Sequence, residues 1–229
     1  RDTSGLVESN SLAFYGSKDF DKMYLKGALS YDWLDAETRR FAFVEGSTAP
    51  IIPVAGVANN LQAQFDGKTF NGRLEAGYKT NWKKLNITPF AGVQLSFAKI
   101  GAATETAAES DDALALAYSK NDAYSAPVFV GAQIDSMFML SEGSIQPYAK
   151  LSFAHDFSTK RAMEASFVSA PGYKFEVQGA VPDANTMDVN LGFKMTSITN
   201  LAFYGQFNGQ YSENGAKNEG GTLGLEVHW

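Results

Sequence analysis

The sequence contains no cysteine, only two histidines and no long uninterrupted apolar run. Without cysteine there can be no disulfide framework and no thiolate metal site, and the histidines and carboxylates show no metal-ligand spacing. The longest apolar stretch, around 51–58, is interrupted by Pro53 and Gly56. It is far shorter than the roughly 20 residues that a membrane-spanning helix needs. These absences exclude a bundle of membrane helices and give no support for a metal or another cofactor.

Basic runs are also missing, and the net charge of −6 argues against nucleic acid as a partner. The 229 residues fit one large all-β domain, and no shift in composition divides residues 1–229 into two. A slightly negative mean hydropathy is compatible with a transmembrane barrel, because half of the residues in each of its strands are polar.

Strict alternation of apolar and polar residues is what the sequence does contain. In the last nine residues Leu223, Leu225, Val227 and Trp229 share one face of a strand, and polar residues or glycine share the other. Residues 187–196 alternate in the same way. A final strand with an apolar face and a terminal aromatic residue is typical of the closing strand of an outer-membrane β-barrel. We therefore predict an all-β fold, an antiparallel up-and-down transmembrane β-barrel.

The alternation predicts nine strands, most of them longer than those of soluble sheets and long enough to cross a membrane at a tilt. They cover residues 9–18, 22–35, 68–80, 86–99, 124–139, 144–157, 186–197, 200–212 and 220–229.

The predicted connections alternate between short and long. Short turns are expected at 19–21, 82–84, 141–143 and 197–199, and long loops at 36–67, 100–123 and 158–185. Outer-membrane barrels have short periplasmic turns and long extracellular loops, so the C-terminus is expected on the periplasmic side. Residues 1–8 read as a polar outer loop. Because barrels of this kind normally have an even number of strands, strands are expected to precede it.

Several segments, in order, resemble the translocator barrel of autotransporters, which belong to type V secretion. They are residues 12–16, 24–31, 74–78, 87–92, 147–157 and 203–207. The resemblance implies a twelve-stranded outer-membrane barrel with a helix in its lumen and a secreted passenger upstream. It further implies that residues 1–229 lack the first strands and that helix. The expected partners are the outer-membrane lipid, the passenger polypeptide and the barrel-assembly machinery.

The predicted polar face would line the lumen of the barrel, where charged side chains are tolerated. Its charged members are Lys26, Arg73, Glu75, Lys79, Lys150, Asp188, Lys194 and Glu226. The resemblance places Glu75 so that it points into the pore, where its carboxylate could contact the linker helix. It also implies that the terminal strand, with Leu223, Leu225, Val227 and Trp229, is the signal that the assembly machinery recognises through strand pairing.

An enzyme is not expected. His155 and Asp156 are a tempting acid–base pair, but neighbouring residues of a strand point to opposite faces. Two other functions stay open at this stage. One is a small self-contained surface barrel whose long loops bind ligands or host components. The other is a soluble β-sandwich in which the apolar face is a core.

Overall fold

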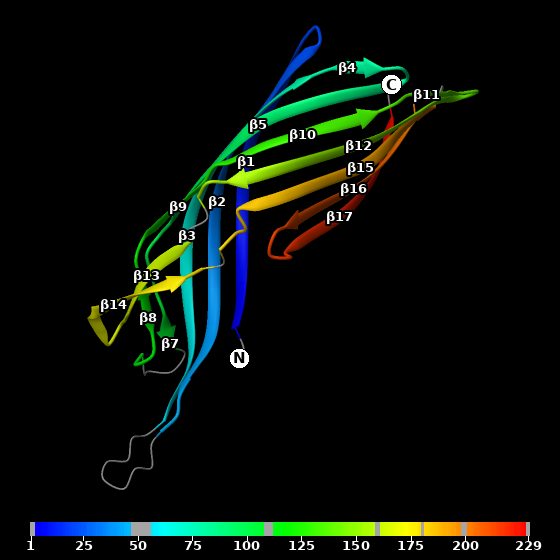
Figure 1. Cartoon of the computed structure of the whole chain (residues 1–229). Helices are drawn as coiled ribbons and strands as arrows, with labels where there is room; N and C mark the ends of the chain where they lie inside the picture. The colour runs from blue at the N-terminus through cyan, green and yellow to red at the C-terminus, as the bar shows by residue number, and fades with distance from the viewer. Residues whose placement is uncertain are drawn as a thin grey trace.

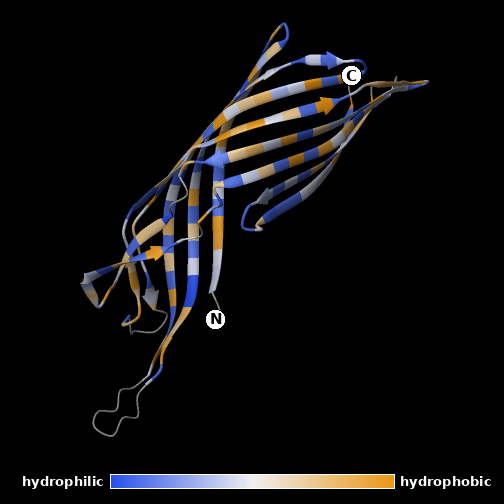
Figure 2. Cartoon of the chain, viewed as in Figure 1, coloured by the Kyte–Doolittle hydropathy of each residue, from blue (hydrophilic) through white to orange (hydrophobic). Residues whose placement is uncertain are grey.

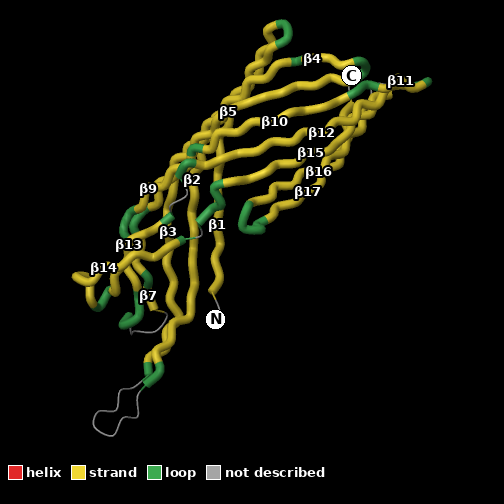
Figure 3. The backbone as a smooth tube through the Cα atoms, in the orientation of Figure 1, coloured by secondary structure: helices red, strands yellow, loops and turns green. Residues whose placement is uncertain are grey.

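The computed structural model describes residues 3–46, 56–107, 112–158, 161–179, 181–197 and 201–227. None of these residues lies in a helix (Figure 3). The described part of the chain accordingly contains no helix that could span a membrane.

Nine strands follow one another in a single antiparallel sheet, which curls into a half-barrel (Figure 1). Each strand pairs with the next one along this path, as an up-and-down topology requires. The strands in order are β1 (Thr3–Phe20), β2 (Met23–Val44), β3 (Val57–Tyr78), β5 (Leu85–Ile100), β10 (Pro127–Asp135), β12 (Gly143–Asp156), β15 (Asn185–Ser197), β16 (Leu201–Ser212) and β17 (Lys217–Val227). The predicted fold class is confirmed.

Short strands extend this sheet or form a second one. Four of them pair with strands of the main path: β4 (Thr80–Trp82), β7 (Thr106–Ala107), β9 (Asn121–Ser125) and β11 (Phe138–Leu140). A separate four-stranded sheet has the order β14-β13-β8-β6. Its strands are β6 (Ala103–Thr104), β8 (Leu116–Tyr118), β13 (Ala162–Phe167) and β14 (Ala170–Gln178). We call this smaller sheet the outer lobe.

The two ends of the half-barrel differ in their connections, as the sequence predicts. Two-residue turns join β1 to β2 and β4 to β5, and Asp21 and Lys83 adopt positive φ values of 53° and 58° in them. A third short turn joins β11 to β12. The fourth predicted turn, 197–199, lies largely outside the described residues. The outer lobe and the long β2–β3 hairpin lie at the opposite end (Figure 1).

Four predicted loops were wrong in part. Residues 36–67 are not a free loop, because β2 continues to Val44 and β3 begins at Val57. Residues 1–8 are not a loop in their described part, since β1 begins at Thr3. Residues 100–123 and 158–185 contain most of the short strands, including those of the outer lobe. The backbone groups of these segments pair with one another, which is why the strands extend past the range of simple alternation.

Hydrophobic and hydrophilic residues alternate along many of the strands (Figure 2), and successive residues of a strand point to opposite faces of the sheet. The convex face carries exposed apolar side chains on every strand of the main path, and we call this surface the apolar band. It includes Leu12, Phe14, Leu25, Leu29, Tyr31, Phe70, Leu74, Val93, Leu95, Phe97, Val128, Val130, Leu151, Phe153, Leu191, Phe193, Phe203, Phe207, Leu223 and Leu225. No described element covers these side chains, so they are not the core of a soluble sandwich.

Beyond Trp33 the polarity of the two faces of β2 and β3 is exchanged. The convex face becomes charged, with Asp35, Glu37 and Arg39 following Trp33 on β2. The concave face becomes apolar, and Leu61 and Ala63 are each only 2% exposed. The outer lobe lies against this part of the concave face, where the rings of Phe65 and Tyr118 are 5.4 Å apart. The extension of β2 and β3 therefore has a core of its own, outside the apolar band.

Candidate functional site

The concave face carries a buried carboxylate, that of Glu75 on β3. Its residue is 5% exposed, and Tyr24 Oη donates a hydrogen bond to Glu75 Oε1 over 2.8 Å. Lys150 Nζ lies 3.1 Å from Oε2 and Arg73 Nη2 lies 3.6 Å from the same oxygen. Lys26 is directly opposite Glu75 on the neighbouring strand. Four of the predicted lumen residues thus meet in one cluster, with three cations around one carboxylate.

The ion pair between Lys150 and Glu75 identifies the concave side of the sheet. Lys150 belongs to β12 and Glu75 to β3, and two strands, β5 and β10, lie between them. In a flat sheet about 14 Å would separate the two backbones, because strands are about 4.8 Å apart. The side chains meet because both lean toward the centre of curvature. The residues that share their face consequently face the interior of the half-barrel.

Two aromatic rings, those of Phe90 on β5 and Phe129 on β10, lie beneath the charged groups of Lys150 and Arg73. Lys150 Nζ lies 4.2 Å from the centre of the Phe90 ring, and Arg73 Cζ lies 4.0 Å from that of Phe129. Both rings are buried and belong to one small cluster with Tyr24. A cation above the face of an aromatic ring is favoured electrostatically, so the two rings stabilise the same positive charges that surround Glu75.

Glycine opposite each of these rings makes room for it. Phe129 faces Gly92 across the strand pair, and Phe90 faces Gly131. A Cβ atom at either glycine would overlap the facing ring. The same arrangement recurs elsewhere on the concave face. The further pairs are Tyr24 with Gly77, Tyr148 with Gly192, and Tyr204 with Gly224.

A second group of predicted residues lies toward β15–β17. Gln210 Nε2 donates to Asp188 Oδ1 over 3.0 Å. Lys194 on β15 pairs with Glu226 on β17 over 2.8 Å, passing across β16 at the fully buried Ala202. The remaining predicted residue, Lys79, lies near the short-turn end and pairs with Asp19 over 2.7 Å.

Between the two groups the concave face forms a polar groove of about 410 Å³. Arg73 and Lys150 lie at one side of it, and its other lining residues are hydroxyl, amide and carboxylate side chains with two glycines. They include Ser152, Asp188, Asn190, Asn208, Gln210 and Asn218. These side chains can exchange hydrogen bonds with a polypeptide backbone or with water, but they define no single apolar pocket for a small molecule.

The terminal strand β17 has one edge paired with β16 and no described partner on the other. Leu223, Leu225 and Val227 project from it and are 85%, 56% and 50% exposed. Trp229, the last member of the predicted signal, lies outside the described residues.

The histidine and aspartate at the end of β12 do not form a catalytic pair. His155 Nδ1 lies 2.8 Å from Asn185 Oδ1. The carboxylate of Asp156 instead accepts hydrogen bonds from Ser125 and from the backbone of Ala126. Within the described ranges no group of three or more histidines and carboxylates is placed to hold a metal ion.

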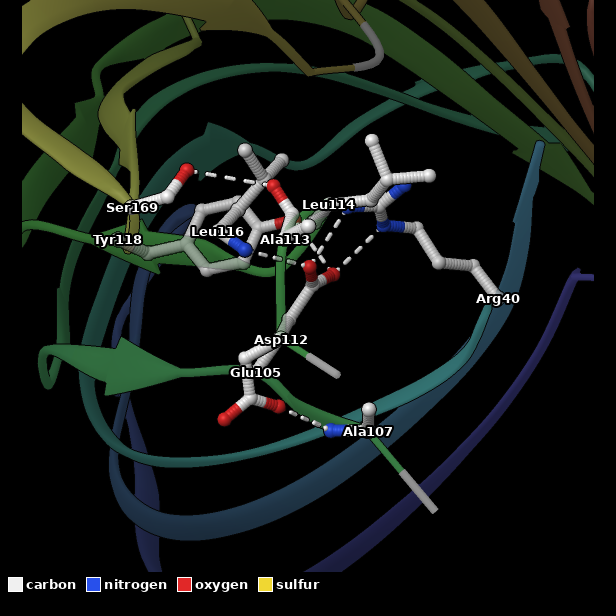
Figure 4. A network of polar contacts seen from close by, with 9 residues as sticks. All are labelled: Arg40, Glu105, Ala107, Asp112, Ala113, Leu114, Leu116, Tyr118 and Ser169. Carbon is white, nitrogen blue, oxygen red and sulfur yellow. Dashed lines mark hydrogen bonds and ion pairs between the residues drawn. The ribbon is translucent and has the colours of Figure 1, made fainter. Parts of the chain in front are cut away.

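A polar network fastens the outer lobe to β2 (Figure 4). Arg40 Nε and Nη2 donate to the two oxygens of Glu105 over 2.7 and 2.6 Å, and Glu105 also accepts from Leu116 N and Tyr118 Oη. Glu105 is 3% exposed. The hydrogen bond to Glu105 raises the pKa of Arg40, and burial, reinforced by the same carboxylate, raises the pKa of Tyr118. This site was not predicted from the sequence, because Arg40 and Glu105 are 65 residues apart.

Comparison with known proteins identifies a family and similar solved structures. The model of the autotransporter β-domain family matches residues 1–208. Among solved structures, the chain is similar to the translocator domain of autotransporter NalP from Neisseria meningitidis, with a TM-score of 0.65 and 14% sequence identity. The match covers 99% of this chain and 69% of that one. No curated protein sequence is similar enough to count as a match.

Proposed function

Because the chain belongs to the autotransporter β-domain family, we propose that it anchors in the outer membrane and assists export of an upstream passenger to the cell surface. The observation that carries this proposal is the separation of the two faces of the half-barrel. Apolar side chains cover the convex face, while the concave face holds the Glu75 cluster and the polar groove. Such a sheet suits hydrocarbon on one side and a hydrated polypeptide on the other.

The passenger segment would contact the polar groove during export. Amide and hydroxyl groups such as those of Asn190, Asn208 and Ser152 accept and donate hydrogen bonds without demanding a particular side chain. Around Glu75, three cations face one carboxylate, so this part of the groove has an excess of positive charge. We propose that Lys26, Arg73, Glu75, Lys79, Lys150, Asp188, Lys194 and Glu226 line the lumen and that Glu75 contacts the linker segment.

The orientation proposed is that of other outer-membrane barrels, with short turns in the periplasm and the outer lobe outside the cell. The turns at Asp21 and Lys83 and the end of β17 lie at the same end of the sheet, which supports a periplasmic C-terminus. Both β1 and β17 have one edge without a described partner. We propose that strands outside residues 1–229 close the sheet there, and that β17 with Trp229 is recognised by the barrel-assembly machinery.

The test is to fill the groove while the barrel still folds. In bacteria that produce the full-length protein, N190W/N208W should leave a tagged passenger inaccessible to external protease. Heat-dependent gel mobility reports whether the barrel has assembled. The matched control is L191W, next to Asn190 but on the convex face, which should export normally. Equal surface exposure of the passenger in all three proteins would contradict the proposal.

A further inference from the structure

Two lysines lie directly opposite each other on the convex face, Lys68 of β3 and Lys99 of β5. Both are exposed, and neither takes part in a hydrogen bond or ion pair with any described residue. Like charges at directly opposed positions of a sheet are destabilising. An anion bound between the two ammonium groups would therefore stabilise this part of the sheet.

The two lysines lie at the margin of the apolar band that is nearer to the outer lobe. Lys68 is opposite Trp33 on its other side, and it comes two residues before Phe70 on the same face. Lys99 likewise comes two residues after Phe97. Aromatic residues mark the level at which hydrocarbon gives way to lipid headgroups. The two ammonium groups thus begin where the apolar side chains end.

Nearby carboxylates of this chain form no ion pair with either lysine. Asp122 is opposite Lys99 on β9, and Asp66 precedes Lys68 by two residues, yet neither carboxylate is within ion-pair distance of a lysine. Lys120 borders the same surface depression of about 510 Å³ as Lys68 and Lys99. Asp35 lies opposite Asp66 on β2, so three ammonium groups and three carboxylates share this margin, and Lys68 and Lys99 remain without an ion-pair partner among the described residues.

We propose that Lys68 and Lys99 bind a phosphate group on the headgroup of a phosphorylated glycolipid in the outer leaflet of the membrane. The inference rests on the proposed function, which puts the outer-lobe end of the apolar band at the outer leaflet. A phosphate between the two ammonium groups accepts charge-assisted hydrogen bonds from both and removes their mutual repulsion. Lys120 contributes to the field that attracts it.

The experiment uses the full-length protein folded in detergent micelles and a bisphosphorylated lipid A as the probe, with binding measured by native mass spectrometry. K68Q/K99Q should weaken binding by roughly tenfold or more, at about fivefold for each lysine near a charged surface. K83Q is the matched control, because Lys83 also lies beside a tryptophan, 5.5 Å from the Trp82 ring, but at the opposite end of the sheet. It should bind like the unmodified protein.

Further measurements distinguish the phosphate of a glycolipid from free phosphate and from the phosphate of another lipid. Dephosphorylated lipid A should bind the unmodified protein and K68Q/K99Q equally weakly, and millimolar inorganic phosphate should not displace the lipid. Equal binding of bisphosphorylated lipid A to both proteins would overturn the proposal, as would preference for phosphatidylglycerol or displacement by free phosphate. Passenger export in the same variants tests the proposed function separately, since loss of lipid binding leaves the groove intact.

Discussion

Lys150 Nζ lies 3.1 Å from Glu75 Oε2, although two strands separate the strands that carry them. The contact exists only because the sheet is curled, so a substitution at either residue tests whether the two side chains meet in the folded protein. Glu75 is 5% exposed and Lys150 is mostly buried, so loss of the carboxylate leaves the partly desolvated Lys150 ammonium without its ion-pair partner.

Glu75→Gln should destabilise the folded barrel by on the order of 3 kcal/mol, because it breaks a buried ion pair and leaves Lys150, Arg73 and Lys26 unbalanced. The measurement is the free energy of unfolding in urea, with the protein in detergent micelles. The matched control is Lys194→Gln, which breaks the half-exposed pair with Glu226 and should cost about 0–1 kcal/mol. Similar costs for both variants would show that Glu75 is not in a desolvated cluster.

Gly192→Ala should destabilise the barrel by about 1–3 kcal/mol, because the three atoms nearest to its Cβ would all belong to the Tyr148 side chain and would overlap it. The cost should disappear when the alanine is introduced into Tyr148→Ala, which removes the ring. Unfolding of the four proteins of this double-mutant cycle gives the coupling energy. Gly220→Ala, where a Cβ meets open space, is the control and should be nearly neutral. A coupling energy of zero would contradict the ring-over-glycine arrangement.

Leu191→Arg should impair membrane assembly far more than Asn190→Arg, although the two substitutions introduce the same side chain at adjacent positions. Leu191 is in the apolar band, where an arginine near the middle of the bilayer costs about 2–4 kcal/mol. Asn190 lines the polar groove on the concave face, where a charge stays hydrated. The fraction of heat-modifiable protein in outer-membrane preparations measures assembly. Equal fractions would mean that the two faces are wrongly assigned.

Glu105→Gln should loosen the outer lobe without unfolding the barrel, because Arg40, Leu116 N and Tyr118 all donate to the carboxylate of Glu105. We expect faster cleavage of the lobe by external protease and unchanged gel mobility of the barrel. Glu164→Gln, which breaks an exposed pair with Lys174 on the same lobe, should leave the cleavage rate nearly unchanged. Equal cleavage rates for the two variants would contradict the anchoring role of Glu105.

High pH should loosen the same lobe. Burial raises the pKa of Tyr118 above its ordinary value of 10.0, so the neutral phenol is favoured in the folded state. The stability that this contributes is fully present below about pH 10 and is lost as the pH rises through the raised pKa. Protease cleavage of the lobe should therefore accelerate above that pH, and Tyr118→Phe should remove this dependence. An unchanged pH profile in Tyr118→Phe would assign the effect to another group.

The alternation of the sequence was sufficient to predict the sheet and its two faces. Leu191 and Phe193 are exposed on the convex side, as their parity indicated. Short turns near Asp21 and Lys83 were also predicted, since both lie between alternating segments of opposite direction. Local pattern contains this information because side-chain direction has a period of two and needs no knowledge of the partner strand.

Strand register and long-range contacts could not be predicted in the same way. The pairing of Tyr148 with Gly192 depends on which residues of β12 and β15 are opposite each other, and several registers keep the same faces. The Arg40–Glu105 pair depends on a loop that folds back on β2. The continuation of β2 beyond residue 35 was not predicted, because the apolar residues change parity there and the simple alternation ends.

That change of parity gives the barrel a defined depth in the bilayer. If the sheet moved outward by one row of side chains, Phe70 would enter water, and if it moved inward, Lys68 would enter hydrocarbon. Either displacement costs free energy, so the free energy has a minimum at this vertical position and rises on both sides of it. The change from apolar to charged residues on the convex face of β2 and β3 therefore fixes the depth of the sheet in the bilayer, and with it the distance of the outer lobe from the lipid.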